Sequence, residues 1–189
     1  MGDMLKDRVA VITGSGNGLG RADAIAFAAQ GARVVVNDLG VTHDGYGASS
    51  NVADLVVEEI QKAGGVAVAN HASVATEDGA ESIIQQAIDE FGRIDILVNN
   101  AGIIRHQNID AIITDDWDLT VKTHLYGMMY CTRAAAAYMK KQKYGRILCT
   151  SSHIGFGFPG QASYSTVKEG IVGFARTVAR ELAEYEVTC

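Results

Sequence analysis

The chain has 189 residues, 48% of them hydrophobic and 20% charged, and its formal net charge is −6. This length suits a single domain with a sizeable core, and the composition excludes a disordered chain. The mildly acidic balance argues against nucleic acid or an anionic membrane as a partner, so we expect neither.

Short apolar runs alternate along the chain with helix-like segments that end at glycine. The runs predict strands at Val9–Thr13, Val34–Asn37, Val66–Asn70, Ile96–Val98 and Arg146–Thr150, and the start of a sixth at Glu186–Cys189. The segments between them predict helices at Gly20–Gln30, Asn51–Ala63, Gly79–Phe91, Thr114–Lys141 and Tyr164–Glu184, with a long loop at Leu39–Ser50. Apolar runs of this kind are typical of parallel sheets buried on both faces. The alternation therefore predicts an α/β fold, a Rossmann-type doubly wound parallel sheet flanked by helices.

A glycine-rich turn, TGSGNGLG at residues 13–20, separates the first strand from the first helix. Glycine lets the backbone turn tightly and approach a pyrophosphate, and the start of the helix offers N–H groups and a positive dipole end. Although a plain tight turn would have similar composition, the position between strand and helix favours a dinucleotide site. The predicted cofactor-binding residues are Gly14, Ser15, Gly16, Asn17, Gly18, Leu19 and Gly20.

Asp38 ends the second predicted strand, where dinucleotide-binding folds place an acid on the ribose 2′-hydroxyl. A carboxylate there accepts a hydrogen bond from the hydroxyl and repels a 2′-phosphate. Asn17 precedes Gly18 and Leu39 follows Asp38, so neither neighbour supplies a basic group for that phosphate. We therefore predict NAD rather than NADP, with Asp38 and Leu39 at the cofactor. A solvated loop acid is the alternative, and it fits this position less well.

Tyr164 and Lys168 are four residues apart on a predicted helix and share one of its faces. A nearby ammonium lowers the pKa of a phenol, and a tyrosine tuned in this way can exchange a proton with a hydroxyl or carbonyl near neutral pH. The pair follows a predicted strand and two serines, Ser151 and Ser152. This order indicates a site for acid–base catalysis.

These motifs together resemble the short-chain dehydrogenase/reductase family over essentially the whole chain. The matching segments are the turn at residues 13–20, the run Asn99-Asn100-Ala101-Gly102, the Ser151-Ser152 pair and Tyr164-x-x-x-Lys168. The segment after the second strand and the residues around Trp117 look like one branch of the family. That branch comprises the hydroxyacyl-CoA dehydrogenase domains of peroxisomal multifunctional enzymes type 2 and their bacterial relatives.

The resemblance implies a nicotinamide cofactor and reversible hydride transfer between an alcohol and a carbonyl. It makes Tyr164 the general acid/base and Lys168 the residue that lowers its pKa and holds the nicotinamide ribose. A serine hydroxyl would polarise the substrate oxygen. The resemblance also places Ser73, Val74, Asn100, Ala101 and Gly102 at the cofactor, makes Asn99 a structural brace, and implies a homodimer or homotetramer.

Two serines compete for the catalytic role. The usual spacing to the tyrosine indicates Ser151, whereas the strand register and the pattern Ser152-x-x-Gly155 indicate Ser152. We favour Ser152, because a strand end is held by the sheet while loops absorb deletions.

Two further positions depart from the family pattern. Ala72 stands where many members have an acid that holds the adenine amino group, which predicts a weaker hold on adenine. His124 stands where the family has a helix asparagine that supports a water relay to the lysine, so we include it among the candidate catalytic residues. A partly buried histidine satisfied by local hydrogen bonds is an equally supported interpretation.

Cysteine and histidine spacing predicts neither a disulfide nor a metal site. Cys131, Cys149 and Cys189 form no CxxC pair, which is typical of reduced intracellular thiols. The histidines form no HxxxH or HExxH motif. The sequence shows no long apolar run and no signal-like segment, so we expect a cytoplasmic protein.

We therefore expect an NAD-dependent oxidoreductase that interconverts a secondary alcohol and a ketone, with 3-hydroxyacyl thioesters, including acyl-CoA, as candidate small-molecule substrates. A 3-oxoacyl, steroid or polyol reductase of the same family is one alternative. A catalytically impaired NAD-binding fragment is the other, because the sequence stops inside the predicted sixth strand, before the family's substrate-covering segment. On either view residues 1–189 form one dinucleotide-binding domain.

Overall fold

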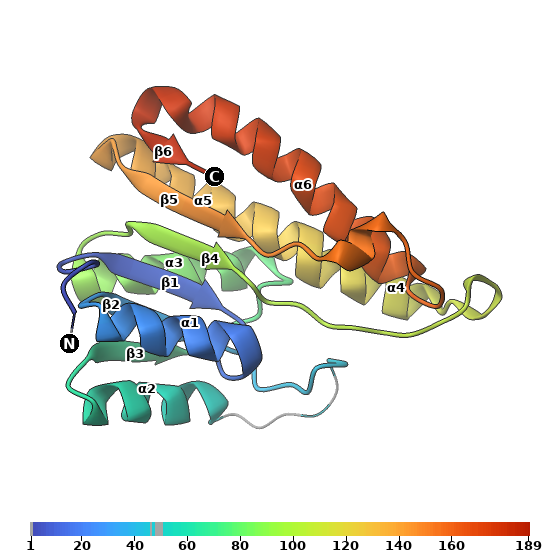
Figure 1. Cartoon of the computed structure of the whole chain (residues 1–189), viewed down its shortest axis with the longest axis horizontal. Helices are drawn as coiled ribbons and strands as arrows, with labels where there is room; N and C mark the ends of the chain where they lie inside the picture. Colours follow the sequence, from blue (N-terminus) through green and yellow to red (C-terminus); the bar gives the residue numbers. More distant parts are fainter. Residues whose placement is uncertain (1, 46, 48–50) are drawn as a thin grey trace.

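The computed structural model describes residues 2–45, 47 and 51–189. Its centre is a six-stranded sheet in the order β3-β2-β1-β4-β5-β6, in which every paired strand is parallel to its neighbour (Figure 1). The strands are β1 (Val9–Thr13), β2 (Arg33–Asn37), β3 (Val66–Asn70), β4 (Ile96–Asn99), β5 (Gly145–Cys149) and β6 (Val187–Thr188). The predicted doubly wound α/β fold is confirmed, and each strand boundary lies within one residue of its prediction.

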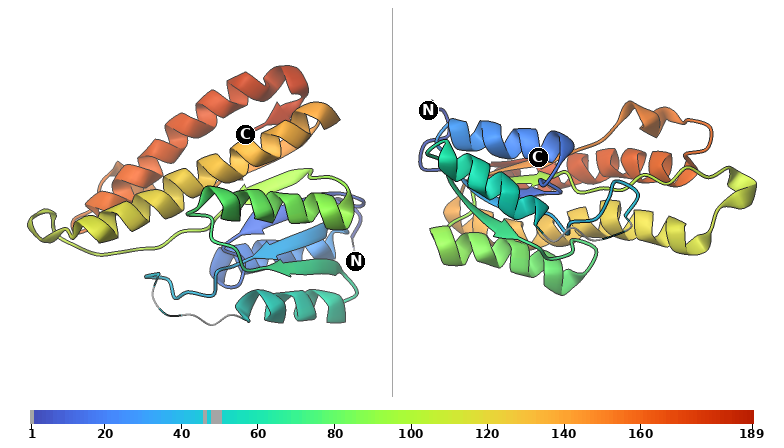
Figure 2. Two further views of the ribbon diagram at one scale, coloured as in Figure 1. Left: turned by 180° about the vertical axis from the view of Figure 1, so that it is seen from behind. Right: turned by 90° about the horizontal axis from the view of Figure 1, so that it is seen from below.

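Helices cover both faces of this sheet. They are α1 (Gly18–Ala29), α2 (Val52–Lys62), α3 (Glu77–Phe91), α4 (Thr114–Val121), α5 (Gly127–Gln142) and α6 (Ala162–Leu182). Helices α1 and α2 lie on one face, and α3 and α5 lie on the other (Figure 2). The chain runs from β1 outward to β3 on one side and from β4 to β6 on the other, so the carboxyl ends of β1 and β4 flank the point where the strand order reverses. Open α/β sheets bind ligands at this point.

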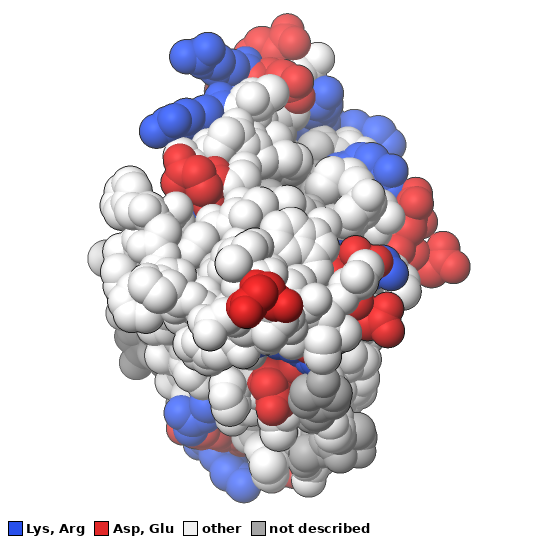
Figure 3. Space-filling view, turned by 90° about the vertical axis from the view of Figure 1, so that its right-hand side faces the viewer, with Lys and Arg blue, Asp and Glu red and all other residues white. Residues whose placement is uncertain are grey.

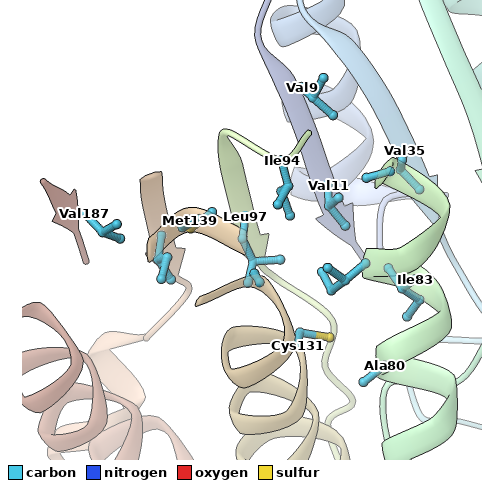
Figure 4. Close-up of a cluster of buried hydrophobic side chains, with 14 of the residues drawn as sticks. Val9, Val11, Val35, Ala80, Ile83, Ile94, Leu97, Cys131, Met139 and Val187 are labelled. Carbon is cyan, nitrogen blue, oxygen red and sulfur yellow. The ribbon is translucent and has the colours of Figure 1, made fainter. Parts of the chain in front are cut away.

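One apolar core lies on each face of the sheet, between the strands and the helices that cover that face. Successive strand residues point to opposite faces, so β1 contributes Val9 and Val11 to one core and Ala10 and Ile12 to the other. Figure 4 shows Val11 and Ile83 among the side chains of the core that α3 and α5 share with the sheet. This burial on both faces explains why the strands appear in the sequence as continuous apolar runs.

The predicted helix Thr114–Lys141 is interrupted. A π-helical segment, Lys122–Tyr126, separates α4 from α5. Segments of this type are short irregularities that occur often at functional sites, and this one has His124 at its centre. Helix α6 begins at Ala162, so Tyr164 lies within its first turn and not at its start.

The predicted loop after the second strand is partly described: residues 46 and 48–50 of Leu39–Ser50 lie outside the described residues. Its first part crosses to the segment after β4, where the Ile104 N–H donates to the His43 carbonyl over 3.0 Å. Across the described residues, no helix combines the length and the apolar character needed to cross a membrane.

Candidate active site

The glycine-rich turn has a backbone path that side chains would obstruct. Gly14 has a φ of +63°, and a Cβ on it would lie 2.7 Å from the Ala101 Cα. A Cβ on Gly16 would lie 2.8 Å from a carboxylate oxygen of Asp38. The turn therefore packs directly against the segments that follow β2 and β4, and the first residues of α1, Gly18 and Leu19, line the cleft described next.

A cleft of about 650 Å³ opens at this edge of the sheet. Its walls come from the glycine turn, the loop that follows β2, the turn that follows β3 and the segment that follows β4. The predicted cofactor residues that line it are Gly14, Asn17, Gly18, Leu19, Asp38, Leu39, Ser73, Val74, Asn100, Ala101 and Gly102. Figure 3 shows this end of the molecule, where uncharged side chains dominate and most Lys and Arg side chains lie toward the margins.

Three residues of the predicted glycine-turn set lie behind the cleft. The Ser15 side chain is fully buried, and its hydroxyl donates to the Ile12 carbonyl over 2.7 Å. Gly16 and Gly20 are buried as well. The structure therefore gives Ser15 a role in shaping the turn, and the residue does not line the cleft.

Asp38 joins the end of β2 to the glycine turn. One carboxylate oxygen accepts a hydrogen bond from the Gly16 N–H and the other accepts one from the Gly40 N–H, each over 2.8 Å. The side chain is half-buried at the rim of the cleft. Two backbone bonds thus hold the carboxylate in place before any ligand arrives. This preorganisation suits an acid that recognises a ribose hydroxyl.

The Asn100 side chain braces the glycine turn, and the residue also lines the cleft. Its Nδ2 donates to the Thr13 and Gly14 carbonyls, each over 3.0 Å. The Thr13 hydroxyl accepts from the Asn100 and Ala101 N–H groups over 3.1 Å each. Asn99 Nδ2 donates to the Thr132 hydroxyl over 3.0 Å, as a brace would. Sequence reasoning gave Thr13 no role, although its place at the end of β1 was a signal.

Tyr164 lies near both Ser152 and Lys168. The Ser152 side chain is close enough to the Tyr164 phenol to lower the pKa of that phenol. The Lys168 ammonium lies 5.3 Å from the centre of the Tyr164 ring and donates to the Thr150 carbonyl over 2.6 Å. Burial lowers the pKa of Lys168 to about 8. The Thr150 contact was missed from sequence, because a backbone carbonyl carries no side-chain signal.

Ser151 has different partners from Ser152. Its side chain is exposed, and its hydroxyl donates to the backbone carbonyl of Lys168 over 2.8 Å. This bond ties the end of β5 to α6. Ser152 is therefore the serine that lies near the phenol, while the Ser151 hydroxyl bonds to the backbone of α6.

The pKa of Tyr164 departs from its expected direction. Burial raises the pKa of the phenol above its ordinary value, and the nearby Ser152 side chain opposes that rise. The role of Lys168 in lowering this pKa stays a prediction, since burial of the phenol and its Ser152 neighbour are the causes that act here. The phenol is consequently protonated near neutral pH.

His124 is buried against both Tyr164 and the segment after β4. Its Nε2 lies 3.1 Å from the Ile103 nitrogen and 2.9 Å from the Ile103 carbonyl oxygen. Its ring meets that of Tyr164 edge to face. Burial, followed by the charge of Lys168, lowers the pKa of His124 to about 4, so the imidazole is neutral at physiological pH. The contacts place His124 where it can orient Tyr164.

A small cavity of about 10 Å³ shares Val74, Ala101 and Thr123 with the cleft and is also lined by Lys168. Thr13 and His124 line it as well. Across residues 2–45, 47 and 51–189, no group of three or more His, Cys, Asp or Glu side chains could hold a metal ion.

Comparisons with known proteins agree with this geometry. The sequence model of the family described as short chain dehydrogenase matches residues 8–189. The chain is 55% identical over 183 residues to peroxisomal multifunctional enzyme type 2 of Drosophila melanogaster, covering 96% of this chain and 30% of that protein. It is 45% identical to a 3-oxoacyl-(acyl-carrier-protein) reductase of Synechocystis sp., covering 97% and 72%.

A solved structure is similar to the whole described fold. The crystal structure of a short chain dehydrogenase from Mycobacterium avium superposes with a TM-score of 0.90 at 46% identity, covering 97% of this chain and 66% of that one. The chain thus spans less than a third of the Drosophila relative and about two thirds of the mycobacterial one.

Proposed function

The chain belongs to the short-chain dehydrogenase family, and from this membership we propose that it is an NAD-dependent oxidoreductase that interconverts a secondary alcohol and a ketone. Tyr164 is the general acid/base in this proposal. The observation that carries it is the nearness of Tyr164 to both Ser152 and Lys168. The Lys168 side chain lines a small cavity that shares Val74, Ala101 and Thr123 with the glycine-turn cleft. Acid–base groups and a dinucleotide-sized cleft at one edge of the sheet are what hydride transfer requires.

The residues of the cleft fit a dinucleotide. The glycine turn and the start of α1 would hold the pyrophosphate, and Asp38 would accept a hydrogen bond from the adenosine ribose. NAD, when bound, would supply the hydride acceptor. Preference for NAD over NADP is supported by the carboxylate of Asp38, which would repel a 2′-phosphate, and by the neutral neighbours Asn17 and Leu39.

Three side chains would handle the proton and the charge on the substrate oxygen. Ser152 would donate a hydrogen bond to that oxygen, where negative charge grows as a ketone is reduced. Tyr164 would transfer its proton to the same oxygen, since its raised pKa keeps it protonated near neutral pH. Lys168, held by the Thr150 carbonyl, would stabilise the phenolate that remains. The reverse sequence oxidises an alcohol.

A 3-hydroxyacyl or 3-oxoacyl thioester is the substrate we propose. Support comes from the 3-oxoacyl-(acyl-carrier-protein) reductase that the chain resembles over 97% of its length. The cytoplasmic location and the homodimer or homotetramer expected from the sequence stay predictions.

The direct test is the initial rate at which NADH or NADPH forms with a panel of alcohols. The panel contains 3-hydroxyacyl-CoA esters of two chain lengths, a steroid alcohol and a polyol, each with NAD and with NADP. We expect turnover with the thioesters and NAD. Absence of turnover with every alcohol, by protein that binds NAD, would overturn the proposal.

A further inference from the structure

Three amide side chains form a continuous hydrogen-bonded chain between α3 and the edge of the cleft. On α3, Gln86 donates from Nε2 to the Ala69 carbonyl over 3.0 Å. Its Oε1 accepts from Asn70 Nδ2 over 2.8 Å. Asn70 Oδ1 in turn accepts from Asn37 Nδ2 over 2.9 Å. The chain therefore links α3, the end of β3 and the end of β2.

This amide chain ends on the turn that follows β3. Asn37 Nδ2 also donates to the Ala72 carbonyl, and the Ala72 N–H donates to Asn70 Oδ1, each over 2.9 Å. Residues Ala72–Ala75 line the cleft, whereas Asn70 and Gln86 lie outside its lining. The position of the turn is thus set by Asn37, which lines the cleft, and by Asn70 and Gln86 behind it.

The same chain reaches the other parts of the adenosine end. The Asn37 carbonyl accepts from the Ser15 N–H over 2.9 Å, and the Asp38 N–H donates to the Asn70 carbonyl over 3.0 Å. The glycine turn, the acid that would hold the ribose and the turn after β3 are therefore held in one network. The Ala72 side chain is only a methyl group. The groups that a bound adenine would contact here therefore depend on the path of the Ala72 backbone, which these bonds define.

We propose that Gln86 is a positioning residue that sets the affinity of this site for the adenosine half of NAD, acting through Asn70 and Asn37. The inference rests on the proposed function, since it assumes that the cleft holds NAD. Gln86 touches neither the cofactor nor the reacting atoms, so its effect belongs in binding and not in turnover.

The test compares Gln86→Leu with Gln85→Leu. Gln85 precedes Gln86 on α3 and also makes two side-chain hydrogen bonds, to Asp89 and from Tyr138, but these lie on the exposed side of the helix. Titration calorimetry gives the Kd of NAD and of ADP-ribose, a probe that lacks nicotinamide. We expect Gln86→Leu to raise both Kd values by about tenfold, with kcat at saturating NAD unchanged. Gln85→Leu should leave both Kd values as they are.

A third variant keeps the result interpretable. Gln86→Glu retains an acceptor for Asn70 but loses the donor to Ala69, so its Kd should rise by about threefold. If Gln86→Leu does not fold, the Kd values of Gln86→Glu are compared with those of Gln85→Leu instead. Unchanged Kd values in the Gln86 variants, or an equal rise in Gln85→Leu, would overturn the inference. Wild-type protein that fails to bind NAD would instead overturn the proposed function.

Discussion

The His124 imidazole meets the Tyr164 ring edge to face, with centroids 5.4 Å apart and an angle of 88° between the planes. Such contacts are directional, because the positive edge of one ring faces the negative face of the other. His124 is anchored in turn by the backbone of Ile103, directly after the Asn99–Gly102 run. The ring of Tyr164 is therefore oriented by the segment that lines the cofactor cleft.

We expect His124→Ala to lower kcat by roughly tenfold to a hundredfold while leaving the Kd of NAD near its wild-type value. Without the imidazole the Tyr164 ring would lose its orientation, and a displacement of a catalytic group by about 1 Å can lower the rate about a hundredfold. His124→Asn should recover part of the rate, because the asparagine amide can still hydrogen-bond to the Ile103 backbone. Steady-state kinetics and calorimetry measure both quantities. Full turnover by His124→Ala would remove this residue from the mechanism.

The two serines provide a matched pair. We expect Ser152→Ala to reduce kcat by about a hundredfold, since it removes a hydrogen-bond donor from the developing oxyanion. Ser151→Ala loses a bond to the Lys168 carbonyl in the second turn of α6, so it should reduce the melting temperature with a far smaller effect on kcat. Turnover and thermal unfolding of both variants test the assignment, and the opposite ranking of kcat would reverse it.

Removal of the phenol hydroxyl should separate binding from chemistry. We expect Tyr164→Phe to lower kcat by about 10²–10⁴-fold, the usual contribution of a positioned acid or base. NAD should still bind, because the glycine turn and Asp38 are untouched. The measurement is single-turnover NADH formation beside calorimetric NAD binding. A Phe variant with near wild-type kcat would disprove the role of Tyr164.

Cofactor preference should depend on the charge of Asp38. We expect Asp38→Asn to weaken kcat/KM for NAD by about tenfold and to raise it for NADP, because the amide keeps an oxygen acceptor but repels no phosphate. The ratio of kcat/KM values for NAD and NADP is the quantity to measure. If that ratio is unchanged, another residue selects the cofactor.

The buried ammonium of Lys168 should make the free energy of unfolding depend on pH. Its pKa is about 8 in the fold against an ordinary 10.5, so between these values the unfolded chain binds more protons. The free energy of unfolding contributed by this group therefore rises as pH increases through that window. Lys168→Met should lack the rise, whereas Lys141→Met, at an exposed position, should retain it. Denaturant unfolding at several pH values compares the slopes, and parallel slopes for all three proteins would contradict the burial.

The order of elements and the strand boundaries were predictable from the sequence by itself. Strands buried on both faces must be apolar throughout, and a tight approach between backbone segments requires glycine, so both features appear directly in the residues. The pairing of Tyr164 with Lys168 was predictable too, because the helical repeat places residues four apart on one face.

Contacts between distant segments were decided only by the tertiary structure. Which serine meets Tyr164 depends on the path of β5 into α6, and the direction of the Tyr164 pKa depends on how much water the surrounding elements exclude. The brace at Asn100 and the amide chain from Gln86 to Ala72 join residues that are far apart in sequence or bond through backbone groups. A local pattern specifies the periodicity of one segment, but it carries no information on the partners that packing brings to it.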